Sequence, residues 1–98
     1  MEIKNLYESV MILGEKLTNE EYKVELEKIK DYFKNCEIIN FEEMGLRKLA
    51  YEIKNNKQGF YILVEFQSKS DEIREIERLY RIDDNILKFI VIRKDCWM

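Results

Sequence analysis

The 98-residue sequence contains no histidine, no proline, three glycines and two cysteines. Without histidine, the chain lacks the side chain that most often serves as a general base or a metal ligand near neutral pH. The glycines form no phosphate-cradling loop, which excludes a dinucleotide-binding fingerprint. The cysteines, Cys36 and Cys96, are isolated from each other, which argues against a zinc site. We therefore expect no catalytic residues, no metal and no cofactor.

Long apolar runs and domain boundaries are also missing. The run from Val10 to Leu13 is too short for a membrane span or for the core of a signal peptide. We therefore expect a soluble cytoplasmic protein with no membrane partner, in which Cys36 is a small buried hydrophobe and Cys96 a tail thiol. Without proline, repeat or linker, residues 1–98 are predicted to form a single domain with a short C-terminal tail at about 94–98.

The charge is modest in total but uneven along the chain. The net charge of −3 argues against a strongly basic nucleic-acid-binding protein. Four cations nevertheless lie in one stretch that contains a single acid, Glu52; they are Arg47, Lys48, Lys54 and Lys57. Charge alone favours an ordinary solvated hairpin tip here, and the alternative is a site that contacts phosphate.

Two segments have the periodicity of amphipathic helices. Thr18 and Glu21 are spaced as a capping box that begins a helix ending near Asn35. The predicted buried face of this helix consists of Tyr22, Leu26, Ile29 and Phe33. Ser70 is the predicted N-cap of a second helix. The predicted buried stripe of that helix consists of Ile73, Ile76, Leu79 and Tyr80.

Extended segments surround the two helices. The predicted strands are residues 6–13, 36–41 continuing through 46–53, 60–66 and 86–93. Gly45 interrupts the second of these and predicts a bulge or bend. Alternation beyond Gly45 predicts a buried set consisting of Leu49, Tyr51 and Ile53. Turn residues from Asn55 to Gly59 predict a hairpin. The third strand is apolar on both sides, which is typical of a central strand.

This order of elements predicts an α+β, ferredoxin-like β-α-β-β-α-β fold, with a four-stranded antiparallel sheet and two helices on one face. The uncovered face would carry large apolar groups, as interaction sites do. The strand from Gly59 to Phe66 compares only in part with the central strand of RNA recognition motif domains. Tyr61 and Ile62 break its pair of base-stacking aromatics, so base stacking is not expected. Asp83 and Asp84 are interpreted as a solvated turn and cap and not as a cation site.

Two further motifs carry a resemblance to a known family. The first is Met44–Lys54, M-G-L-R-K-L-A-Y-E-I-K, followed by G-F-Y at 59–61. The second joins I-E-R at 76–78 to the segment around 84–88. The chain resembles the bacterial ribosomal small-subunit protein six family over nearly its whole length. It departs from the family pattern at Met44, where Trp is usual, at Glu52, where Pro is common, and at Lys88, where Arg is frequent and offers a bidentate fork.

The resemblance implies a ferredoxin-like structural component of the small ribosomal subunit that is not an enzyme and has no small-molecule substrate. It implies binding to the central domain of 16S ribosomal RNA as a heterodimer with ribosomal small-subunit protein eighteen. The residues expected to contact RNA or the partner are Arg47, Lys48, Lys54, Lys57 and Arg93. The first alternative is a ferredoxin-like regulatory or ligand-binding module. The second is an oligomerising ferredoxin-like enzyme, against which the lack of histidine weighs.

Overall fold

The computed structural model describes residues 4–94 of the chain. Its elements are β1 (Asn5–Gly14), α1 (Asn19–Tyr32), β2 (Glu37–Ile53), β3 (Asn56–Ser68), α2 (Ser70–Ile82) and β4 (Ile86–Arg93). Their order is the predicted one. No helix within this described part is long and apolar enough to cross a membrane.

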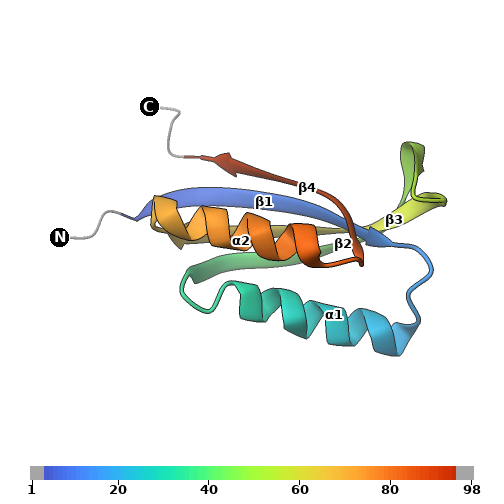
Figure 1. Ribbon diagram of the computed structural model, residues 1–98, viewed down its shortest axis with the longest axis horizontal. Helices are drawn as coiled ribbons and strands as arrows, with labels where there is room; N and C mark the ends of the chain where they lie inside the picture. The colour runs from blue at the N-terminus through green and yellow to red at the C-terminus, as the bar shows by residue number, and fades with distance from the viewer. Residues whose placement is uncertain (1–3, 95–98) are drawn as a thin grey trace.

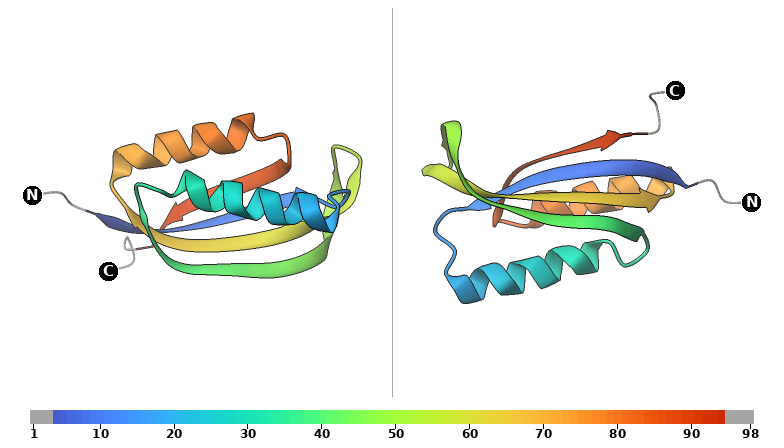
Figure 2. Two further views of the ribbon diagram at one scale, coloured as in Figure 1. Left: turned by 90° about the horizontal axis from the view of Figure 1, so that it is seen from below. Right: turned by 180° about the vertical axis from the view of Figure 1, so that it is seen from behind.

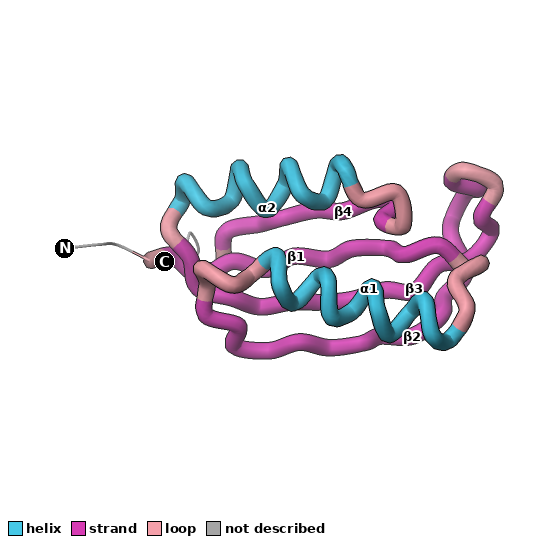
Figure 3. The backbone as a smooth tube through the Cα atoms, turned by 60° about the horizontal axis from the view of Figure 1, so that its bottom comes forward, coloured by secondary structure: helices cyan, strands magenta, loops and turns pink. Residues whose placement is uncertain are grey.

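The four strands form one sheet in the order β2-β3-β1-β4, with every neighbouring pair antiparallel. Both helices pack against the same face of this sheet (Figures 1 and 2). The tube in Figure 3 shows the same two layers, with α1 and α2 in front of the strands. The arrangement confirms the ferredoxin-like α+β fold. The opposite face, which the helices leave uncovered, is called the open face below.

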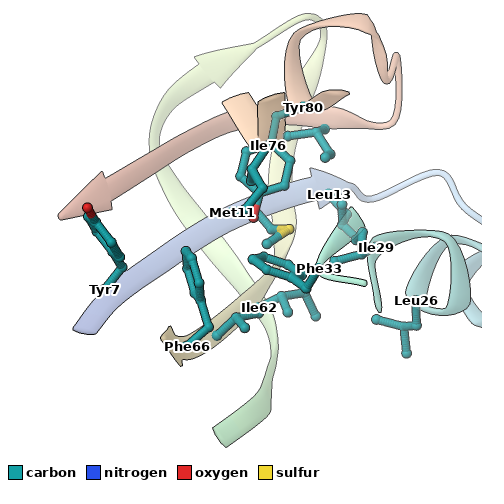
Figure 4. Packing of buried hydrophobic residues seen from close by; sticks show 12 residues of the cluster. Tyr7, Met11, Leu13, Leu26, Ile29, Phe33, Ile62, Phe66, Ile76 and Tyr80 are labelled. Carbon is teal, nitrogen blue, oxygen red and sulfur yellow. The ribbon is translucent and has the colours of Figure 1, made fainter. Parts of the chain in front are cut away.

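Alternation along the two central strands divides the side chains between the faces. On β1, Met11 and Leu13 point to the helices and are fully buried, while Val10 and Ile12 lie on the open face. The core between sheet and helices is closed by aromatic rings, among them Phe33 against Phe66 with centroids 4.7 Å apart (Figure 4). The other buried residues of this core are Tyr7, Leu26, Ile29, Ile62, Val64, Ile76, Tyr80 and Ile86.

The helices confirm most of their predicted starts and faces. The Thr18 capping box is present, because the Glu21 N–H donates to Thr18 Oγ1 at 3.2 Å and the Thr18 N–H to Glu21 Oε1 at 2.9 Å. The predicted Ser70 cap is wrong, since Ser70 is the first helical residue and Lys69 stands at the N-cap position without a capping hydrogen bond from its side chain. Ile76 on α2 is 1% exposed. The buried stripe therefore fixes α2 without the help of a cap.

The strand β2 is bent by irregularities in its pairing with β3. Gly45 lies at one of these register shifts with φ +87, so the predicted bulge there is confirmed. The hairpin turn itself is shorter and earlier than predicted. Lys54 and Asn55 both have positive φ, 47 and 66, between the paired residues Ile53 and Asn56. Positive φ at both central residues makes this a two-residue type I′ turn.

The alternation predicted for the end of β2 fails beyond Leu49. Leu49 is buried, but Tyr51 is 61% exposed and Ile53 only half-buried. The reason is a register shift between Lys48 and Ile53, where four residues of β2 stand opposite Lys57 alone. Side chains in such a bulge no longer follow the two-residue period of a strand. The prediction that Tyr51 is buried was therefore wrong.

Asp83 corrects another prediction, because it is 3% exposed and not solvated. The Tyr32 hydroxyl donates to Asp83 Oδ2 at 2.8 Å, and the Asn85 N–H donates to Oδ1 at 3.0 Å. Lys94 corrects the predicted tail, since its N–H donates to Leu6 O at 2.8 Å and so continues the pairing of β4 with β1. The rest of that tail, with Cys96, lies outside the described residues. Cys36 is half-buried beside the core.

Candidate nucleic-acid and protein interface

The end of the β2–β3 hairpin, residues 47–58, projects past the end of β1 and is called the hairpin arm. It rises from the sheet on the side away from α1 (Figure 1). Arg47, Lys48, Lys54 and Lys57 all lie on it and all are exposed. Within residues 4–94, none of these four side chains forms an ion pair. The structure thus places four of the five predicted site residues on one arm, with Glu15 close to Lys57 at its base.

Arg93 is not part of this cluster. It pairs with Tyr7 at the far end of β1, whereas the hairpin arm begins beyond Gly14. Seven residues of strand separate the two points, which is about 23 Å. One Arg93 Nη donates to Asn5 Oδ1 at 3.0 Å, so the guanidinium already has a partner within the fold. The predicted site therefore divides into two places.

The hairpin arm is attached to β4 by a contact that the sequence did not predict. Lys88 Nζ donates to the Tyr51 hydroxyl at 3.0 Å and lies 5.6 Å from the centre of the Tyr51 ring. The hydrogen bond with Tyr51 raises the pKa of Lys88. The signal that could have indicated Lys88 is its parity on β4, which it shares with Ile90 and Ile92 of the open face.

The base of the hairpin arm is attached to the loop after β1. Glu15 Oε2 accepts the backbone N–H of Lys57 at 2.6 Å and that of Gln58 at 2.9 Å. The N–H groups of Gln58 and Lys57 lower the pKa of Glu15. In return, the Glu15 N–H donates to Asn56 Oδ1 at 3.0 Å. No pattern in the sequence links Glu15 to a segment more than forty residues away.

The open face is largely apolar beside the hairpin arm. Val10 lies between Leu63 on β3 and Ile90 on β4, and Ile90 is 51% exposed. A shallow hollow of about 230 Å³ is lined by Val10, Ile12, Tyr61, Lys88, Phe89 and Ile90. The expected exposed apolar surface is therefore confirmed, and it is continuous with the contact that holds the hairpin arm.

Charge changes sign along the open face. Away from the hairpin arm, Glu8 and Glu65 face each other across the β1–β3 pair, and Lys94 Nζ lies 3.5 Å from Glu8 and 2.9 Å from Glu65. The hydrogen bond from Lys94 lowers the pKa of Glu65. Across residues 4–94, no group of three or more His, Cys, Asp or Glu side chains is placed to hold a metal ion. The arrangement offers two binding surfaces, a cationic arm and an apolar sheet, next to a margin where Lys94 pairs with Glu8 and Glu65.

Comparison with known proteins gives one consistent result. The family model described as ribosomal protein S6 matches residues 6–93. The small ribosomal subunit protein bS6 of Caldanaerobacter subterraneus subsp. tengcongensis is 43% identical over 91 residues, covering 91% of this chain and 96% of that protein. That of Thermoanaerobacter pseudethanolicus is 42% identical with the same coverage. The crystal structure of 30S ribosomal protein S6 from Thermotoga maritima superimposes with a TM-score of 0.89 at 29% identity, over 96% of this chain and 91% of that one.

Proposed function

Because the chain belongs to the ribosomal protein S6 family, we propose that it binds the central domain of 16S ribosomal RNA together with ribosomal small-subunit protein eighteen. Family membership confirms the resemblance expected from Met44–Lys54. It makes the chain a structural component of the small ribosomal subunit in the cytoplasm, and not an enzyme. It also favours this interpretation over the ligand-binding module that the fold alone allowed.

The observation that carries the RNA contact is the group of four exposed cations on the hairpin arm. Cations that neutralise phosphates release the counterions condensed on the RNA, and this release drives RNA binding. We assign phosphate contacts to Arg47, Lys48, Lys54 and Lys57. Arg93, at the other end of β4, is proposed as a separate contact to RNA or to the partner.

The open face supports the partner contact. With a net charge of −3, the chain has little unspecific attraction for RNA and gains from a basic partner. The partly exposed apolar side chains of β1 and β3, together with the exposed Ile90 and Ile92 of β4, supply an area to bury. Partner and RNA would then meet where the open face adjoins the hairpin arm.

The test is reconstitution with a central-domain RNA fragment and the partner protein, measured over a range of salt concentrations. Arg47→Ala/Lys48→Ala is expected to weaken RNA binding and to reduce the salt slope by roughly 2, about 1 for each lost phosphate contact. Lys23→Ala/Lys34→Ala removes two exposed cations from the helix side and serves as the matched control. Equal affinity of the two double variants for the RNA would show that Arg47 and Lys48 of the hairpin arm do not contact phosphate.

A further inference from the structure

We propose that Glu15 and Asn56 form a clamp that sets the direction of the hairpin arm and so positions its cations on RNA. The inference rests on the proposed function. Glu15 is a positioning residue in this scheme, although it is an acid at the base of a basic arm. The two residues come from distant parts of the chain, the loop after β1 and the start of β3.

The clamp stands where ordinary strand pairing ends. β1 pairs with β3 up to Gly14 and Gly59, so the backbone of β3 before Gly59 has no neighbouring strand on that side. The Glu15 carboxylate takes the place of that strand. Its single oxygen Oε2 accepts two consecutive backbone N–H groups, from Lys57 at 2.6 Å and Gln58 at 2.9 Å. Backbone donors of the arm are thereby fixed to the body of the protein.

Asn56 completes the clamp from the other side. It is 6% exposed, and its amide makes three hydrogen bonds. Oδ1 accepts the Glu15 N–H, while Nδ2 donates to Ile53 O at 3.3 Å and Lys54 O at 3.0 Å. Ile53 and Lys54 stand at the turn of the hairpin arm. One buried side chain therefore ties the turn to the loop after β1.

The hairpin arm needs such a tie, because its own ladder does not fix it. The pairing of β2 with β3 is interrupted between Lys48 and Ile53. The other attachment described above, from Tyr51 to Lys88, joins two exposed side chains. That attachment is a single hydrogen bond, whereas the clamp has five, three of them made by the buried side chain of Asn56. Leu49 is buried at the base of the arm, and the buried Asn56 amide with the Glu15 carboxylate adds the directional contacts that orient the four cations.

The charge of Glu15 and its place in the clamp predict opposite effects of its removal on RNA binding. As a mere charge, the carboxylate repels phosphate, and its removal strengthens RNA binding. As part of the clamp, it orients the arm, and its removal weakens binding. Glu15→Gln and Glu15→Ala separate the two effects, because both remove the charge and only the glutamine keeps an oxygen that can accept the two N–H groups.

The experiment measures binding of each variant to the central-domain RNA fragment with the partner protein present. Glu15→Gln is expected to bind as tightly as the wild type or more tightly. Glu15→Ala is expected to bind more weakly than Glu15→Gln, with a salt slope lower by about 1 to 2 as phosphate contacts are lost. In the free protein, the amides of Lys57 and Gln58 should exchange hydrogen faster in the alanine variant alone, with the core amides unchanged.

Each outcome has a distinct meaning. If the wild type binds RNA and the two Glu15 variants bind equally, the clamp is overturned while the proposed function stands. If the wild type with its partner does not bind the RNA, the proposed function fails and the clamp fails with it. Asn56→Ala adds a second test, because members of one clamp do not give additive losses. A Glu15→Ala/Asn56→Ala loss equal to the sum of the single losses would also overturn the inference.

Discussion

A buried carboxylate beside a second carboxylate is the residue-scale feature that local sequence patterns did not reveal. Glu25 on α1 is 2% exposed, and its Oε1 accepts from Asn85 Nδ2 at 2.8 Å. Its Oε2 has no hydrogen-bond donor in the described structure. Burial and the neighbouring Asp83 raise the pKa of Glu25 to about 7. The orphaned oxygen is explained if it carries a proton and donates it to Asp83.

Asp83 keeps its charge in this pair. Burial opposes its ionisation, but the neighbouring Glu25 and hydrogen bonds from Tyr32 and the Asn85 backbone hold the pKa of Asp83 below its usual range. Lys28 Nζ, 3.8 Å from Asp83 Oδ2, adds to the same effect. α1 is thus joined to the α2–β4 turn by the hydrogen bond from Asn85 to Glu25, next to a carboxyl pair whose charge changes as Glu25 loses its proton with rising pH.

This pair predicts that stability falls as the pH rises from about 5 to 8. A folded-state pKa raised above the unfolded value stabilises fully below the unfolded pKa, and the gain is lost as the pH rises through about 7. Between pH 5 and 8 the free energy of unfolding should fall by roughly 1–3 kcal/mol. Glu25→Gln donates to Asp83 at any pH, so urea titrations should show a flatter profile and higher stability than the wild type at pH 8.

The control for this prediction is Glu20→Gln, which removes an exposed carboxylate from the same helix. It should leave the profile of the wild type unchanged. A Glu25→Gln protein with the same slope as the wild type would mean that Glu25 is ionised throughout this range and that the proton is not shared.

At the scale of the elements, the sequence predicted what depends on neighbours in the chain. Periodicity located both helices and all four strands, and β4 was predicted with its bounds, Ile86–Arg93. The errors lie where tertiary contacts determine the local structure. Tyr51 is turned outward by a bulge in the β2–β3 pairing, and the turn at Lys54 is held by the distant loop that carries Glu15. Neither cause has a local pattern from which it could be read.

Gly59 tests how closely β3 approaches β1 at the root of the hairpin arm. A Cβ added there would lie 2.4 Å from Ile12 Cγ2 and 3.0 Å from Leu13 O, so a methyl group has no room. Gly59→Ala should therefore destabilise the protein by about 1–3 kcal/mol in urea or thermal unfolding. Gly14→Ala, across the same strand pair, meets Asn56 Oδ1 at an ordinary 3.5 Å and should cost less. Equal losses of stability in the two variants would show that the close approach of β3 to β1 does not exclude a methyl group at position 59.

At the scale of the whole molecule, the sequence predicted the sheet, the two helices and an apolar face without a cover. It also named five candidate cations, four in the hairpin stretch and Arg93 near the tail, without placing them relative to one another in space. Arg93 is close to the hairpin arm in neither sequence nor space, because the antiparallel order of β1 and β4 carries it to the opposite end. The topology of the sheet decides which charged residues lie close together in space, and counting charges along the chain cannot reveal this.

The same topology separates the proposed RNA contacts from the proposed partner contacts, and this gives the last prediction. Ile90 is 51% exposed at the centre of the open face, next to Val10. Ile90→Asp places a charge in the proposed partner interface and should weaken heterodimer formation with ribosomal small-subunit protein eighteen by roughly tenfold or more, measured by calorimetry. Ile82→Asp is the matched control, since Ile82 is 64% exposed at the end of α2, outside the open face. If Ile82→Asp disrupts the heterodimer and Ile90→Asp does not, the partner binds the helical side, and the open face must be assigned to something else.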